Sequence, residues 1–179
     1  MKRYILLTLT ALVLHTGTLF AQSAQPREKS EVEIFMQQVA KGTKSNEIDY
    51  AYISTSMFKQ LISQLFSVID DEARSEMGLD KIFGSTMYLR RFISTGEEGY
   101  QILSKAMQPF LEEEESVMGM ELSAVNRQDG VVSIIYGNSE NVLVINDYAE
   151  ADNLTAVFIA GMSYDAFMEL DGSGIDLAF

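Results

Sequence analysis

The dominant hydrophobic period of this chain changes near Glu115, and that change constrains the fold more than any other feature. Before it, most apolar residues recur at spacings of three and four, which is typical of amphipathic helices. After it, apolar and polar residues alternate almost to the end, which is typical of strands. Helices concentrated in one half and strands in the other predict an α+β domain.

Three segments of the first half have helical periodicity. Their apolar stripes consist of Val32, Phe35, Met36 and Val39; of Phe58, Leu61, Ile62, Leu65, Phe66 and Ile69; and of Tyr100, Leu103, Met107, Phe110 and Leu111. Gly42 ends the first helix. Ser54, Thr55 or Ser56 can cap the second, because a hydroxyl accepts from a free helix N–H. Pro109 lies inside the third and removes a backbone donor, so we expect a kink or a restart there.

Strands are predicted at residues 50–53, 85–95, 118–124, 131–136, 142–148 and 154–162. Asp129-Gly130 is a tight hairpin signal, and further turns are predicted at 137–141 and 150–153. The last four strands therefore form an antiparallel C-terminal β-meander, followed by a short helix over 164–170. The final strand is nearly all apolar, which favours a position buried on both faces.

The expected architecture is an antiparallel sheet with amphipathic helices packed on one face. The other face is then exposed or bound to a partner, and Tyr136, Asn146 and Tyr148 are the residues expected to decorate it. We expect a single domain over residues 31–179, with a flexible tail from about residue 171.

Met1 to Ala21 has the features of an export signal: Lys2 and Arg3 precede an apolar stretch that ends at a small residue. The stretch is shorter and more polar than the about 20 apolar residues that a membrane helix needs, and no later stretch has membrane length. Gln22 to Ser30 is then a polar linker. The chain has no cysteine, which excludes a lipoprotein anchor. We therefore expect the protein in the periplasm or the extracellular space.

Composition excludes several kinds of function. The net charge is −13, and removal of Lys2 and Arg3 with the signal takes it two units lower. Such a charge repels phosphate backbones, so nucleic acid is not an expected partner. The single histidine, His15, lies in the predicted signal. Ser-His-Asp and Cys-His catalysis and histidine-ligated zinc are therefore excluded. There is no glycine-rich phosphate loop, and no cofactor is predicted.

Ser56-Met57-Phe58-Lys59 matches S-x-x-K, in which a serine at a helix start is activated by a lysine one turn later. The S-D-N and K-T-G elements of those enzymes are missing from the sequence. The alternative is a capping Ser56 and a solvated Lys59. A pair of carboxylates could also catalyse hydrolysis, but nothing singles out two of the 26 acidic residues.

Three segments invite a metal-binding interpretation, and each has a structural alternative. Met118-Gly119-Met120 offers thioethers to Cu(I), or two methionines on one face of a strand that fill the core. Glu112 to Glu115 offers oxygen ligands to Ca²⁺, or a solvated acidic helix end. Asp171 to Asp176 has a likeness to a calcium loop but lacks its spaced ligands and terminal glutamate, which favours a flexible tail. No metal ligand is predicted.

Three features occur together in an order typical of one family. An N-terminal signal and helix lead into Ile53 to Lys59, and the apolar segments Val142 to Ile145 and Ala156 to Met162 follow before a final helix. In these motifs the chain resembles the domain-of-unknown-function family 4252, small exported proteins of Gram-negative bacteria. The likeness covers about Glu31 to Leu170. It implies an exported α+β domain and no catalytic residue, because none is assigned in that family.

The expected function is non-enzymatic binding or interaction in the cell envelope, with another envelope protein or an apolar small ligand as the partner. The contact surface is expected on the uncovered sheet face or in the groove beside the sheet edge. One alternative is a small hydrolase that uses Ser56 with Lys59, or a carboxylate pair. The other is a cation-binding module that uses the acidic surface.

Overall fold

The computed structural model describes residues 28–43, 46–57, 60 and 88–172. Glu31–Phe179 forms one compact unit of the chain. The predicted export signal, the predicted helix with the stripe from Phe58 to Ile69, and the tail beyond residue 172 lie outside the described residues.

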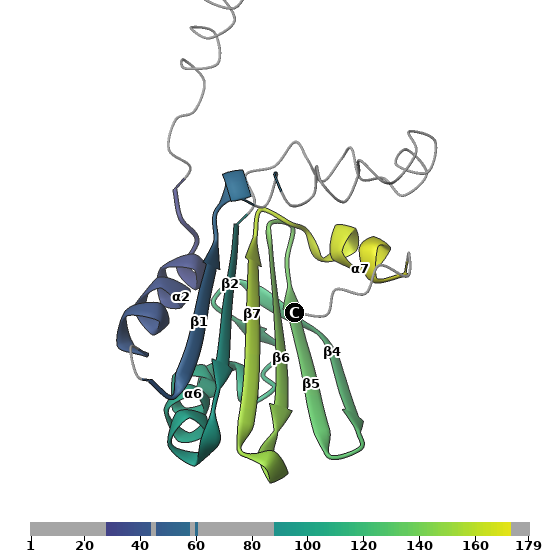
Figure 1. Cartoon of the computed structure of the whole chain (residues 1–179). Helices are drawn as coiled ribbons and strands as arrows, with labels where there is room; N and C mark the ends of the chain where they lie inside the picture. The colour runs from purple at the N-terminus through teal and green to yellow at the C-terminus, as the bar shows by residue number, and fades with distance from the viewer. Residues whose placement is uncertain (1–27, 44–45, 58–59, 61–87, 173–179) are drawn as a thin grey trace, which may run out of the picture. The chain divides into compact units, whose positions relative to one another are not determined.

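Seven antiparallel strands form one curled sheet, which with the helices gives an α+β fold (Figure 1). The strands are β1 (Ile48–Ile53), β2 (Tyr88–Ser94), β3 (Ser116–Val117), β4 (Met120–Gln128), β5 (Val131–Gly137), β6 (Asn141–Tyr148) and β7 (Asn153–Ala160). Their order across the sheet is β1-β2-β7-β6-β5-β4-β3. β7 lies in the interior of the sheet between β2 and β6, and the predicted burial of its two faces is confirmed, since residues 156–160 are all buried.

The predicted meander is confirmed only in part. The strand predicted over 118–124 begins later than predicted. Met118 (φ 51°) and Gly119 (φ 73°) instead form a turn between β3 and β4. Positive φ at two successive residues is the geometry of a tight hairpin. A register shift between Leu122 and Ala124 then interrupts β4, so the simple alternation fails there too. The predicted hairpin at Asp129-Gly130 is present, with φ values of 53° and 78°.

Two helices, α2 (Glu31–Gly42) and α6 (Gly96–Leu111), cover one face of the sheet and bury the main core against it. Their predicted stripes supply Val32, Met36, Val39, Leu103, Met107 and Phe110, and the strands supply Phe92, Tyr136, Leu143, Ile145, Ala156 and Phe158. α6 continues through Pro109 to Leu111, so the predicted restart is wrong. Pro109 costs the helix one backbone bond, which its missing N–H would have donated four residues back, and α6 ends two residues later.

Tyr136 was expected on the exposed face, and this prediction is wrong. Tyr136 pairs with the core residue Leu143, which places it on the face of α2 and α6. Its ring packs against that of Phe110 at 5.2 Å between centroids, and its hydroxyl donates to the Glu114 carbonyl at 3.0 Å. Asn146 and Tyr148 alternate with the core residue Ile145 and face the other way, as expected.

The third helix, α7 (Tyr164–Gly172), lies on the opposite face of the sheet. Successive residues of a strand face opposite sides of the sheet, so Gly137 faces away from the side on which its neighbour Tyr136 lies. A Cβ built on Gly137 would lie 2.7 Å from the Cβ of Tyr164, the first residue of α7. The prediction of one covered face therefore holds only for α2 and α6. α7 also continues two residues beyond its predicted end, through Asp171 and Gly172. A short 3-10 helix, η1 (Ala149–Ala151), occupies the turn that joins β6 to β7.

Candidate binding surface at the edge of the sheet

β1 is an edge strand, and half of its backbone groups face away from the sheet. Thr95 N–H donates to the Glu47 carbonyl at 2.8 Å, so Glu47 and every second residue after it bond toward β2. The N–H and C=O groups of Ile48, Tyr50 and Tyr52 therefore point outward. Among the described residues, these groups have no hydrogen-bond partner. β1 thus presents a row of free backbone donors and acceptors.

Two exposed tyrosines lie along this edge. Tyr50 and Tyr52 share the face covered by α2 and α6, yet they remain 36% and 47% exposed. Each ring rests on a second ring from β2: Tyr50 lies 5.1 Å from Phe92, and Tyr52 lies 5.7 Å from Tyr88. The β2 rings hold these side chains in place while leaving one side open. Fixed, half-exposed tyrosines are typical of binding surfaces.

Arg90 lies among these tyrosines. Its Nη1 donates to the Tyr50 hydroxyl, and its guanidinium lies 4.9 Å from the Tyr52 ring centroid and 5.5 Å from that of Tyr88. Among the described residues, no carboxylate forms an ion pair with Arg90, and its buried Nε has no hydrogen-bond partner. The next residue, Arg91, faces the other side and pairs with Asp49 at 3.2 Å. Arg90 is therefore a cation held by aromatic rings instead of by an anion.

Tyr88 ties this cluster to α2. Its hydroxyl donates to Oε1 of the buried Glu33 at 2.9 Å. Burial raises the pKa of Tyr88, and the hydrogen bond to Glu33 and the charge of Glu33 raise it further, whereas Arg90 acts in the opposite direction. Tyr88 therefore keeps its proton at neutral pH and acts as a fixed donor. The surface formed by Tyr50, Tyr52, Tyr88 and Arg90 is called the tyrosine–arginine edge below.

The opposite edge of the sheet is protected. β3 pairs with the first two residues of β4, and the Glu115 carbonyl accepts from Leu122 N–H at 2.9 Å. The register shift after Leu122 disturbs the next part of β4. Further along, Arg127 forms an ion pair with Glu113, which precedes β3. Short edge strands, bulges and charges are the devices by which proteins block strand addition.

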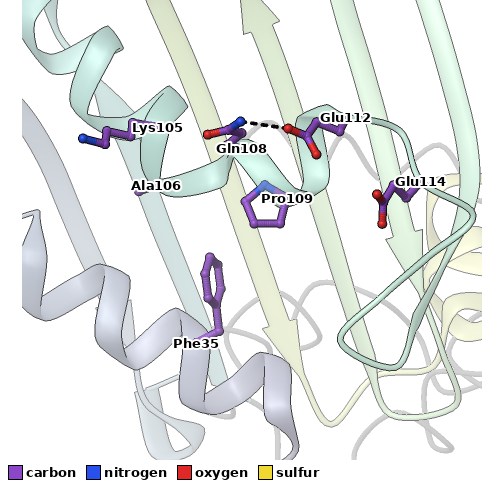
Figure 2. Close-up of a pocket in the computed structure, with 7 residues that line it drawn as sticks. All are labelled: Phe35, Lys105, Ala106, Gln108, Pro109, Glu112 and Glu114. Atoms are coloured by element: carbon purple, nitrogen blue, oxygen red, sulfur yellow. Dashed lines mark hydrogen bonds between the residues drawn. The ribbon is translucent and has the colours of Figure 1, made fainter.

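Figure 2 shows a groove between α2 and α6, with Phe35 on α2 directed toward Pro109 on α6. It measures about 410 Å³ and is lined by Phe35, Lys105, Ala106, Gln108, Pro109, Glu112 and Glu114. Its polar groups are exposed, and Gln108 already donates to Glu112 at 2.8 Å. A ligand there would have to replace that hydrogen bond, and the groove offers little apolar surface for the ligand to bury. The groove is therefore the weaker candidate.

The sheet face opposite α2 and α6, one of the two places where the sequence predicts the contact surface, is mixed in character. Val144 and Ile135 are partly exposed there, but Asn146, Ser133 and Thr155 alternate with them. Polar side chains thus interrupt the apolar ones on neighbouring strands. The wide apolar patch that would mark a docking face is not seen in this part of the described structure.

The predicted Ser56 and Lys59 pair is only half described. Ser56 is exposed, and its Oγ lies 3.0 Å from that of Ser54. Ser54 accepts from Met57 N–H at 3.4 Å, which makes Ser54 the capping residue among the three predicted candidates. Lys59 lies outside the described residues. The Ser-Lys interpretation therefore stays a prediction.

The methionine and acidic segments have structural roles. Met120 is fully buried, and Met118 packs against the same core from the turn rather than from the strand. Glu112 to Glu115 follow α6 instead of forming its last turn, because α6 ends at Leu111. Glu113 is engaged by Arg127. Within the described ranges, no group of three acidic or other metal-binding side chains could hold an ion.

Sequence reasoning missed the tyrosine–arginine edge. Tyr50 and Tyr52 have the two-residue spacing of a strand face, which was a usable signal. Arg90 could not be joined to them, because the register that pairs Arg90 with Tyr52 depends on strand pairing. That β1 is an edge strand also follows only from the order of strands in the sheet.

No protein-family model, curated protein or solved structure matches this chain. In the part of the chain that the structure describes, no helix is long and apolar enough to cross a membrane.

Proposed function

We propose that this protein is a binding module that accepts an extended segment of a partner protein as an added strand beside β1. The observation that carries the proposal is the row of outward backbone groups at Ile48, Tyr50 and Tyr52, next to exposed, fixed tyrosines. In strand addition, backbone hydrogen bonds supply affinity and side chains supply specificity. β1 offers both.

In its own sequence and pairing, β1 lacks several of the features that normally prevent strand addition. Its sequence, Ile-Asp-Tyr-Ala-Tyr-Ile, contains no proline and no lysine, and β1 pairs with β2 without a register shift. Its one charge, Asp49, faces away from the tyrosines and is engaged by Arg91. An edge strand without these devices readily accepts another strand. This favours a recognition role over a purely structural one.

The proposal includes the cellular setting. An export signal over Met1 to Ala21 and the resemblance to family 4252 favour a periplasmic or extracellular protein, so the partner is expected to be another envelope protein. The acidic composition is compatible with this setting, because it keeps the protein from binding anionic surfaces. The likeness to that family adds no catalytic residue, which agrees with a binding role.

Photo-crosslinking from the two edges tests the proposal. A benzoylphenylalanine is placed at position 52 on β1 or, as the matched control, at the exposed position 128 on β4. In the producing cell, position 52 is expected to crosslink to one continuous segment of a partner, mapped by mass spectrometry, and position 128 is not. Equal crosslinking from both positions, or none from position 52, would overturn the proposal.

The backbone contribution is isolated by two substitutions at one position. Tyr50→Ala removes the ring, whereas Tyr50→Pro removes the ring and the outward N–H. Proline is tolerated on an edge strand where its N–H faces outward, so both variants are expected to fold. We expect Tyr50→Pro to lower the position-52 crosslink at least about tenfold relative to Tyr50→Ala, since a strand ladder loses a bond at its centre. Equal yields from the two variants would contradict strand addition.

A further inference from the structure

We infer that Arg90 is a carboxylate-binding residue of the tyrosine–arginine edge, and that the segment docked on β1 carries an acidic side chain beside Tyr50 and Tyr52. This inference rests on the strand addition proposed above. It adds the chemical class of the residue that is recognised.

The position of Arg90 supports this role. Arg90 belongs to β2, and its guanidinium lies near the rings of both Tyr52 and Tyr88 and donates to the Tyr50 hydroxyl, so it lies beside the side chains of the edge strand β1. A strand added beside β1 lies about 4.8 Å away. Its side chains opposite Tyr50 and Tyr52 lie on the same face as these tyrosines. An acidic side chain at such a position can reach the guanidinium.

The electrostatics of Arg90 favour an anionic ligand. An arginine side chain stays charged at all ordinary pH values, and holding a charge away from water without an opposite charge is costly. The chain carries 26 acidic and 13 basic residues, so carboxylates are plentiful. Arg91 and Arg127 each pair with one, but Arg90 has none among the described residues. A carboxylate brought by the partner would supply the missing charge.

The hydrogen-bonding capacity of Arg90 is also unfilled. Within the described structure its only hydrogen bond is the one from Nη1 to the Tyr50 hydroxyl. A carboxylate takes two parallel bonds from a guanidinium, an arrangement that adds strength and fixes orientation. The flanking rings of Tyr52 and Tyr88 restrict the guanidinium before the ligand arrives. Little side-chain entropy is then lost on binding.

Two synthetic peptides test the inference on the full chain. KTVTETVTK places Val, Glu and Val on one face of an extended strand, and KTVTQTVTK replaces the central Glu with Gln. Both carry an acetyl group and a terminal amide, so the only carboxylate is the side chain. We expect the Glu peptide to bind about tenfold more tightly in a fluorescence titration, as a charge-assisted bond allows.

Substitutions locate the effect. Arg90→Gln is expected to abolish the preference for the Glu peptide, and Arg90→Lys to retain a reduced one, because lysine keeps the charge but not the paired donors. Arg91→Gln, on the opposite face, is the matched control and should keep the full preference. Thermal melting of each variant checks that it is folded.

The outcomes separate the two proposals. If both peptides bind the unchanged protein equally, or if Arg91→Gln abolishes the preference as Arg90→Gln does, the carboxylate inference is wrong and strand addition stands. If neither peptide binds at about 1 mM, the weak limit for a specific contact, strand addition itself is wrong.

Discussion

β1 and β4 belong to opposite ends of one sheet, yet in the part of the chain that the structure describes only β4 is protected against further pairing. β4 is partly covered by β3, interrupted after Leu122 and engaged through Arg127 by the segment that precedes β3. The outward backbone groups of β1 have no partner among the described residues, its tyrosines are exposed, and its register is regular. Since the same chain protects one edge, the bare edge is a specific feature of β1.

β1 is bare without being loosely attached. Ile48 is buried in the main core, and the rings of Tyr50 and Tyr52 rest on β2. Its first residues are held by Thr95, whose N–H and hydroxyl both donate to the Glu47 carbonyl. Core packing therefore holds β1 on one side, while its outer backbone groups have no partner among the described residues.

The largest expected effect comes from breaking this attachment. Gly99 on α6 lies against Glu47, and a Cβ added to it would stand 2.2 Å from the Glu47 carbonyl oxygen. Gly99→Ala must push the start of β1 away from α6, which we expect to cost about 1–3 kcal/mol in the free energy of unfolding. Urea denaturation measures the cost. Gly42→Ala is the control, because a Cβ there meets nothing within 4 Å. Equal urea midpoints for the two variants would show that the contact between Gly99 and Glu47 does not hold β1.

A smaller effect is expected from cutting the link between the tyrosine–arginine edge and α2. Tyr88→Phe removes the hydrogen bond that the Tyr88 hydroxyl donates to the Glu33 carboxylate. We expect the free energy of unfolding to fall by about 1–2 kcal/mol. Tyr52→Phe is the control, since its hydroxyl makes no hydrogen bond in the described structure. An equally large fall in the free energy of unfolding for Tyr52→Phe would show that the hydrogen bond between Tyr88 and Glu33 is not the stabilising contact.

The same variant has a predicted pH dependence. The raised pKa of Tyr88 means that the unfolded chain, whose tyrosines ionise near pH 10, loses this proton first. Stability is therefore unaffected by Tyr88 below about pH 10 and falls as the pH rises above it. The pKa values of Tyr100 and Tyr136 are raised as well, so Tyr88→Phe should reduce the alkaline loss without abolishing it. Urea midpoints at about pH 8 and pH 10.5 measure the difference, and an unchanged loss would contradict the prediction.

The fold was largely predictable from periodicity, whereas the binding surface was not. The stripe of Val32, Met36 and Val39 and the alternation of β5 to β7 each reflect contacts within one element and its core. The turn at Met118-Gly119 was missed because Met118 keeps the alternating pattern while adopting a positive φ. Tyr136 was placed on the wrong face because facing depends on register.

The smallest expected effect concerns the protected edge. Arg127 and Glu113 are both partly exposed, so Arg127→Ala should change the free energy of unfolding by less than about 1 kcal/mol. If this pair serves as protection, its loss should instead let β4 pair between molecules. Sedimentation at increasing protein concentration is expected to show weak association for Arg127→Ala and none for Arg91→Ala, whose partner Asp49 lies on β1 and outside this edge. If both variants stay monomeric, the bulge and β3 are sufficient to protect β4, and the difference between the edges is one of backbone geometry rather than charge.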